Sequence, residues 1–258
     1  MTEIHQTAIV HPKAEIDRNV VIGPYSLIGE KVKIGKGTKI GAHVVIEGWT
    51  EIGEDCTFFH MASVGTIPQD LKFSGEETRL RIGRGNTFRE FVTLNCGTRA
   101  GGGETVIGDH NFLMAYAHVA HDCMIGNHVI MANAATLAGH IHIGDYGVIG
   151  GLVGIHQFVR VGAYALVGGC SAVAQDVPPF MCVAGVHAKL YGLNLVGLKR
   201  HGFTEKRIRD LKKAYRILFR SKLPLREAIK KIQDELERSD DISALIRFME
   251  SSKRGICR

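Results

Sequence analysis

The stretch IGPYSLIGEKVKIGKGTKIG, residues 22–41, carries an aliphatic residue every six positions, and glycine follows most of them. The same spacing runs from Ile4 to Val64, with Phe58 as its one aromatic member. It returns between Ile82 and Val173. In the first block, a small or β-branched residue lies four positions after each of these residues. A fixed short period sets the architecture before any local pattern does. We therefore predict a solenoid built from hexapeptides.

Each hexapeptide has room for one short strand and one corner. We expect the aliphatic side chain to point inward, the small residue to fit a crowded interior and the glycine to permit the turn. Three hexapeptides make one triangular coil of 18 residues. Neighbouring coils then pair as parallel strands about 4.8 Å apart.

Two segments interrupt the repeat. Residues 66–79, TIPQDLKFSGEETR, contain proline, glycine and six charged residues. Residues 96–104 contain three consecutive glycines. Both compositions predict exposed loops. Long loops on a compact scaffold are commonly functional or disordered.

The repeat ends at the proline pair 178–179. We therefore assign residues 1–179 to the solenoid domain and residues 180–258 to a linker and a small α-helical C-terminal domain. Residues 180–203 show no period and are expected to be irregular.

Three helices are predicted in the C-terminal part. Thr204 is a candidate N-cap that precedes apolar residues at helical spacing. Pro224 opens a second helix, and Asp240 or Asp241 starts a third. The helices would cover the end of the solenoid and remove an exposed strand edge.

Composition narrows the class of protein. The chain has 258 residues, is 45% hydrophobic and contains no apolar run long enough to cross a membrane. It also lacks the pattern of a signal peptide, so we expect a cytoplasmic protein. The six cysteines form no CxxC pair, which favours reduced thiols over a metal or disulfide framework.

Residues 199–231 contain thirteen Lys or Arg and only three acidic residues. This charge suggests either an acidic partner or solvated helix faces. We expect no nucleic-acid binding, because no recognition motif accompanies the charge.

Histidines gather in one part of the repeat. Residues 18 apart stack in adjacent coils, so His121, Gly139 and Gln157 form one column. Asp122, His140 and Phe158 form the neighbouring column, with His118 and His156 nearby. None of these residues holds an inward position of its hexapeptide, so we expect them on one accessible edge.

The cluster is open to two chemical interpretations. Three histidines from adjacent coils could hold zinc, as in solenoid carbonic anhydrases. Alternatively, His121 could act as a general base that Asp122 orients, with the Gly139 N–H facing a developing oxyanion. Covalent catalysis by Cys123 is disfavoured, because its inward position should bury the thiol. A purely structural solenoid would need no such cluster.

The chain resembles the UDP-N-acetylglucosamine O-acyltransferase family over essentially its whole length. The shared motifs are AHVAHDC (117–123), LAGH (137–140), IHQF (155–158), PQDLK (68–72), GGCSAVAQDVPP (168–179) and NLVGLKRHGF (194–203). The resemblance implies an all-β left-handed parallel β-helix followed by the helical domain. It also implies a homotrimer with active sites between subunits, and no metal or cofactor.

The implied reaction is the first step of lipid A biosynthesis. An R-3-hydroxyacyl group would move from acyl carrier protein to the sugar 3-hydroxyl of UDP-N-acetylglucosamine. His121 would be the base, Asp122 its orienting partner and Gly139 the oxyanion donor. The residues implied in substrate binding are Gln69, Asp70, Lys72, His118, His140, His156, Gln157, Asn194, Arg200 and His201. Lys72 would serve the His121 of a neighbouring subunit, and the basic segment 199–231 would dock the carrier.

Gly169 falls at the position that limits acyl length in this family, and a glycine there implies a long acyl chain. Two alternatives stay open at this point. One is a zinc-dependent enzyme of the carbonic anhydrase type. The other is a sugar-nucleotide acyltransferase that uses a 3-amino acceptor. A related N-acyltransferase carries an additional N-terminal domain, whereas the repeats here begin at Ile4.

Overall fold

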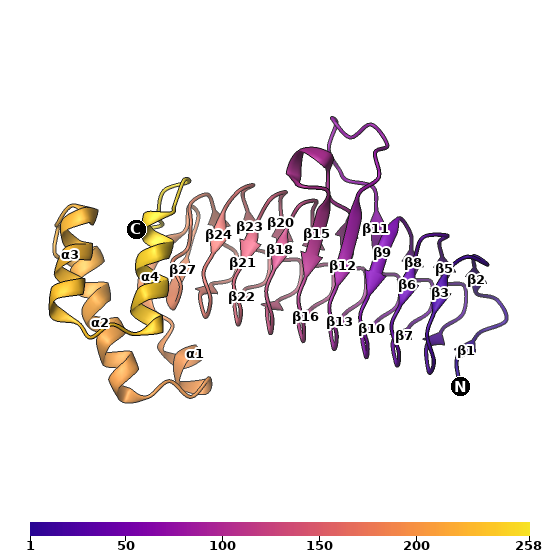
Figure 1. The fold of residues 1–258 in the computed structure, drawn as a ribbon, viewed down its shortest axis with the longest axis horizontal. Helices are drawn as coiled ribbons and strands as arrows, with labels where there is room; N and C mark the ends of the chain where they lie inside the picture. The colour runs from indigo at the N-terminus through magenta and orange to yellow at the C-terminus, as the bar shows by residue number, and fades with distance from the viewer.

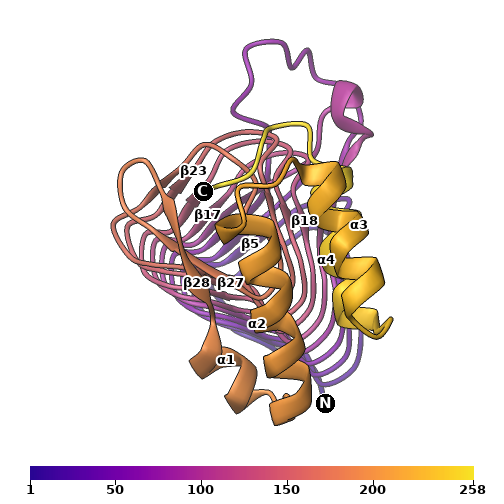
Figure 2. The same ribbon diagram turned by 90° about the vertical axis from the view of Figure 1, so that its left-hand side faces the viewer.

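The computed structural model describes residues 1–258. The chain winds into a long coil of parallel strands, and helices lie at the C-terminal end of that coil (Figure 1). Seen end-on, the coil has a triangular outline (Figure 2). Each side of the triangle is one sheet, and consecutive strands belong to consecutive sides.

The three sheets are named A, B and C in the order in which the chain enters them. Sheet A contains β1 (Glu3–Ile4), β4 (Val21–Ile22), β7 (Lys39–Ile40), β10 (Thr57–Phe58), β13 (Thr87–Phe88), β16 (Phe112–Leu113), β19 (Ile130–Met131), β22 (Val148–Ile149), β25 (Leu166–Val167), β27 (Met181–Ala184) and β28 (Lys189–Leu193). Sheet B contains β2 (Ile9–Val10), β5 (Leu27–Ile28), β8 (Val45–Ile46), β11 (Ser63–Thr66), β14 (Thr93–Asn95), β17 (His118–Val119), β20 (Thr136–Leu137), β23 (Gly154–Ile155) and β26 (Ala172–Val173). Sheet C contains β3 (Glu15–Ile16), β6 (Lys33–Ile34), β9 (Trp49–Ile52), β12 (Arg79–Ile82), β15 (Glu104–Ile107), β18 (Met124–Ile125), β21 (His142–Ile143) and β24 (Arg160–Val161).

The hexapeptide prediction is confirmed by the core. The second residue of a typical strand points inward, and Ile46, Leu113 and Leu137 are at most 1% exposed. The first residue of the strand faces outward. The first coil is the exception, since Ile4 stays 48% exposed at the open end of the solenoid.

The glycine after each aliphatic residue has a different role from the one expected. Gly23 and Gly35 do not have positive φ values. A Cβ on either would lie 2.7 Å from the main chain of the next coil, so these glycines allow the coils to stack closely. The left-handed corner conformation falls two residues later and is held by non-glycine residues such as Tyr25 and His43, with φ of 59° and 57°.

Both predicted loops leave the solenoid at the corner between sheets B and C. The first joins β11 to β12, and the second joins β14 to β15 and contains the short helix η1 (Arg99–Gly101). They project side by side from this corner (Figures 1 and 2). His121, which lies between β17 and β18, belongs to the same corner.

The prediction that residues 180–203 are irregular is wrong. β27 pairs in parallel with β25, Val167 opposite Val183, and β28 returns antiparallel to it. The step from Val167 to Val183 is shorter than a full coil, so it falls outside the hexapeptide period. A further helix, α1 (Leu195–Arg200), follows with Asn194 as its N-cap.

The three predicted helices are confirmed. They are α2 (Glu205–Arg220), α3 (Leu225–Glu235) and α4 (Asp240–Glu250). Thr204 caps α2, Pro224 precedes α3, and Asp240 begins α4. Their apolar faces form a second core together with Phe180 and Met181. The domain division at residue 179 stays a prediction. No helix has the length and apolar character that a membrane span requires.

Candidate functional site

The columns of residues predicted from the 18-residue coil are confirmed. The N–H of His140 donates to the carbonyl of His121 at 3.0 Å, and the N–H of Phe158 donates to the carbonyl of Gly139 at 3.2 Å. The His140 ring also stacks on Phe158, with 4.4 Å between the ring centroids. Three successive coils therefore bring their polar side chains together at the corner between sheets B and C.

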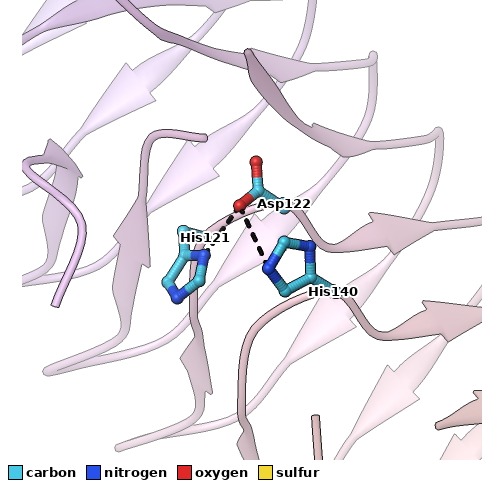
Figure 3. A group of neighbouring side chains, drawn as sticks. All are labelled: His121, Asp122 and His140. Carbon is cyan, nitrogen blue, oxygen red and sulfur yellow. Dashed lines mark hydrogen bonds and ion pairs between the residues drawn. The ribbon is translucent and has the colours of Figure 1, made fainter. Parts of the chain in front are cut away.

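Asp122 lies between the two histidines of this corner (Figure 3). Its Oδ2 is 2.7 Å from Nδ1 of His121 and 3.7 Å from Nε2 of His140. The Asp122 side chain is fully buried, and that of His121 is 12% exposed. A carboxylate only accepts, so Nδ1 of His121 carries the hydrogen and Nε2 keeps its lone pair. The pair is arranged as a base and its orienting partner.

The second loop holds Asp122 in place. Thr98 donates to Asp122 twice, from its N–H to Oδ1 and from its hydroxyl to Oδ2, both at 2.7 Å. A Cβ on Gly101 would lie 2.0 Å from the Asp122 carboxyl carbon, so the loop can close over the carboxylate only with glycine there. Thr98 and Gly101 were not predicted from the sequence. The triple glycine at 101–103 was the one available signal.

Gly139 lies beneath the ring of His121. A Cβ there would be 2.5 Å from Cε1 and 2.7 Å from Nε2 of His121, so any side chain would displace the imidazole. The N–H of Gly139 donates to no atom of the chain. It is therefore free to donate to a group bound beside His121.

Two neighbouring histidines are held uncharged. Burial lowers the pKa of His140, and this effect exceeds the opposing attraction of Asp122. Burial likewise lowers the pKa of His118, and His121 adds to the effect. Nδ1 of His118 is 2.7 Å from the hydroxyl of Thr93. Both rings can therefore serve as neutral hydrogen-bonding groups at pH 7.

The first loop carries Gln69, Asp70 and Lys72. Gln69 and Lys72 are exposed, and the N–H of Lys72 donates to Oδ1 of Asp70 at 3.0 Å. The charge of Asp70 acts on His140 of the same chain, where it favours the protonated form. The loop therefore lies beside the histidine corner of its own chain, while the Lys72 side chain reaches no group of that corner.

His156 and Gln157 belong to the next coil and are exposed, as predicted. A groove of about 850 Å³ runs from this corner across sheet C to the C-terminal segment. Asp122, His140 and Arg254 are among the residues that line it. Arg254, which also contacts His156 at 3.1 Å, was not predicted from the sequence.

The residues predicted to contact the nucleotide lie elsewhere. Asn194 is buried and caps α1, since its Oδ1 accepts from the N–H of Gly197 and its Nδ2 donates to the carbonyl of Tyr164. His201 packs on the rings of Tyr146 and Tyr164, at the corner between sheets C and A. Arg200 is exposed beside it. One chain therefore does not bring these residues to His121.

Gly169 lies between β25 and β26, at the third corner, between sheets A and B. It is exposed, and a Cβ there would touch only the main chain of Gly151, at 3.3 Å. Gly169 and His121 thus occupy different edges of the same chain.

The alternative chemistries are less well supported by the geometry. Cys123 is buried, and burial raises the pKa of its thiol to about 12, which confirms that it cannot act as a nucleophile. The ligand atoms of His121, Asp122 and His140 lie within 4.8 Å of one another, a spacing that could hold a metal ion. However, Asp122 already accepts hydrogen bonds from Thr98 and His121, which a metal would have to displace.

Comparison with known proteins identifies relatives of this chain. A family model described as Udp N-acetylglucosamine O-acyltransferase, domain 2, matches residues 176–257, and one described as bacterial transferase hexapeptide (six repeats) matches residues 104–139. The acyl-[acyl-carrier-protein]--UDP-N-acetylglucosamine O-acyltransferase of Thermodesulfovibrio yellowstonii is 60% identical over all of both chains.

Solved structures extend the likeness to the fold. The UDP-N-acetylglucosamine O-acyltransferase of Moraxella catarrhalis superposes with a TM-score of 0.95 at 41% identity, covering 99% of each chain. LpxA from Acinetobacter baumannii gives a TM-score of 0.96 at 45% identity, again over 99% of each chain. The predicted left-handed β-helix with a helical C-terminal part is thereby confirmed. The chain belongs to the UDP-N-acetylglucosamine O-acyltransferase family.

Proposed function

We propose that this enzyme transfers an R-3-hydroxyacyl group from acyl carrier protein to the 3-hydroxyl of UDP-N-acetylglucosamine, the first step of lipid A biosynthesis. The observation that carries the proposal is the His121–Asp122 pair, with Nε2 of His121 free and the Gly139 N–H beside it. The relatives named above carry this donor and acceptor in their names.

The proposed step is a direct transfer. Nε2 of His121 removes the proton from the sugar 3-hydroxyl while the oxygen attacks the thioester carbonyl. The N–H of Gly139 donates to the resulting oxyanion. The intermediate then collapses, the carbon–sulfur bond breaks, and the protonated His121 returns its proton to the leaving thiolate. Asp122 stabilises the imidazolium that forms in between.

Substrate binding follows from the remaining residues of the corner. In this proposal, neutral His118 and His140 bind oxygen atoms of the sugar together with His156 and Gln157. Gln69, Asp70 and Lys72 close over the sugar nucleotide. Because Asn194, Arg200 and His201 lie at another corner, we propose that they bind the nucleotide at the His121 of a neighbouring subunit in a homotrimer. The basic residues of α2 and α3 would dock the acidic carrier protein.

One assay tests the function. Purified enzyme is given 3-hydroxyacyl carrier proteins of several chain lengths, with either UDP-N-acetylglucosamine or its 3-amino analogue. We expect transfer to the hydroxyl acceptor, and loss of nearly all activity in His121→Ala. His128→Ala changes an exposed histidine at another corner and should keep wild-type turnover. Unchanged turnover in His121→Ala would refute the mechanism, and a preference for the amine would refute the acceptor.

The same assay tests acyl length. We propose that Gly169 leaves room for a long acyl chain between subunits. Gly169→Met adds a side chain at an open position, where a Cβ meets nothing closer than 3.3 Å, so the variant should fold normally. We expect it to shift the preference toward shorter chains. An unaltered chain-length profile would contradict this role.

A further inference from the structure

The C-terminal segment returns to the last coils after α4, seen as the yellow end of the chain in Figures 1 and 2. Asp176 of the coil, only 1% exposed, fixes it. Ser252 donates its hydroxyl to Oδ2 of Asp176 at 2.8 Å, and the N–H of Asp176 donates to the carbonyl of Gly255 at 2.8 Å. The N–H of Cys257 donates to the carbonyl of Asp176 at 2.9 Å. The segment is therefore anchored on both sides of Arg254.

From this anchored position, Arg254 reaches the histidine corner. Its Nη2 lies 3.1 Å from Nδ1 of His156 and 3.3 Å from the carbonyl oxygen of Ala174. His156 is exposed toward the cleft, and its neighbour Gln157 stands in the column of His121 and Gly139. A residue near the end of the chain thus touches a side chain of the candidate active site.

The chemistry of this contact determines the tautomer of His156. A guanidinium can only donate hydrogen bonds, so Nδ1 of His156 has to accept, and the ring hydrogen has to lie on Nε2. The carbonyl oxygen of Gln157 lies 3.1 Å from the same Nδ1 and favours the opposite tautomer, with the hydrogen on Nδ1. Hydrogen bonds from charged donors are roughly twice as strong as those between neutral groups, so Arg254 prevails.

We propose that Arg254 is a positioning residue for the transfer reaction, which holds His156 as the neutral tautomer that donates from Nε2. His156 then offers a hydrogen-bond donor to an oxygen atom of the substrate, whereas His121 offers a lone pair to its proton. The two histidines are set to opposite tautomers by opposite partners, a carboxylate for His121 and a guanidinium for His156. This role in catalysis rests on the proposed function.

A purely structural role for Arg254 is less well supported. The bonds of Asp176 to Ser252, Gly255 and Cys257 anchor the segment without Arg254. Nε of Arg254 is buried and has no hydrogen-bond partner, an arrangement that costs stability. The contact with His156 therefore accounts for this arginine better than the fixing of the segment does.

The first test is spectroscopic and needs no substrate. Nitrogen NMR of the ring distinguishes the two tautomers of a histidine, and His156→Ala assigns the signal. We expect the Nε2–H form in the wild-type enzyme and a shift toward the Nδ1–H form, bonded to the Gln157 carbonyl, in Arg254→Met. Arg254→Lys keeps a donor-only cation and should restore part of the Nε2–H population. Retention of the wild-type tautomer in Arg254→Met would overturn the proposal.

The second test is a double-mutant cycle in the transfer assay. We expect Arg254→Met to lower kcat/KM roughly tenfold in the wild-type background, since a misplaced group costs rate, and to have no effect in His156→Ala. Arg258→Met removes an exposed cation of the same segment and should leave activity unchanged. An equal loss in both backgrounds would mean that Arg254 does not act through His156. If the wild-type enzyme failed to acylate UDP-N-acetylglucosamine, the proposed function would fall, and the tautomer measurement would still decide the assignment of Arg254.

Discussion

Asp122 contributes to the site through the direction of its hydrogen bonds. It accepts from Thr98 on one side and from His121 on the other, and this choice leaves Nε2 of His121 unprotonated. The 3.7 Å separation from Nε2 of His140 is too long for a hydrogen bond, so Asp122 orients one histidine and only attracts the other.

Asp122→Asn should therefore remove catalysis while keeping the fold. The amide oxygen can still accept from Thr98, but the amide N–H₂ would face His121 and force the hydrogen of the ring onto Nε2. By analogy with the same change in serine proteases, kcat should fall by roughly three to four orders of magnitude. Asp109→Asn is a suitable control, since Asp109 also accepts a main-chain N–H at a corner, from Arg84. A loss under tenfold in kcat for Asp122→Asn would show that another group sets the tautomer.

His118 should make stability depend on pH. Burial lowers its pKa in the folded protein below the model value of 6.5, so below that pH the unfolded chain binds more protons than the folded one. The contribution of His118 is therefore present above about pH 6.5 and is lost as the pH falls toward the lower folded pKa. Denaturant unfolding at about pH 7.5 and about pH 5.5 should show a smaller loss of stability for His118→Gln than for the wild type. An equal or larger loss in the variant would show that His118 is not held uncharged by the fold.

At this scale, the sequence predicted which residues meet but not how they bond. The 18-residue register places His121 beside Gly139 without any coordinates. Thr98 could not be predicted, because it lies in a loop outside the register, and its bond to Asp122 depends on how that loop folds back.

Among the elements, helix α2 illustrates what a local pattern can predict. Thr204 accepts a hydrogen bond from the N–H of Arg207 and starts the helix, and apolar residues then follow at helical spacing. Thr204→Ala should lower the free energy of unfolding by about 1 kcal/mol, because an N–H of the first turn loses its partner. Thr204→Ser keeps the acceptor and should lose much less. Denaturant midpoints of the two variants check this, and equal stabilities would show that the cap contributes nothing.

β27 and α1 show where local patterns fail. Val183 pairs beside Val167 only because the proline pair shortens the last coil, so the six-residue period gives no sign of the strand. Helix α1 spans only Leu195–Arg200, too short for a periodic signal to be distinguished from chance. Its N-cap Asn194 holds the carbonyl of Tyr164, a partner distant in sequence.

For the whole molecule, the arrangement of the three corners decides whether one chain can form a complete site. His121 lies at the corner between sheets B and C, Gly169 at the corner between A and B, and His201 at the corner between C and A. The same count that stacks His121 on Gly139 separates it from Gly169. A substrate that touches all three residues must therefore lie between subunits. The proposed trimer accounts for a spread that a single chain leaves unexplained.

Mixed oligomers test this arrangement. His121→Ala and Lys72→Ala are each expected to be inactive alone. If Lys72 serves the His121 of a neighbour, co-assembly in equal amounts regenerates sites in which one subunit supplies His121 and the next supplies Lys72. Random assembly then gives about one quarter of wild-type activity, because each site requires two independent choices in a closed symmetric ring. If Lys72 serves its own His121, as the effect of Asp70 on His140 of the same chain would suggest, the mixture stays inactive. Wild-type subunits mixed with His121→Ala provide the reference, since their activity should fall only in proportion to the wild-type fraction under either arrangement.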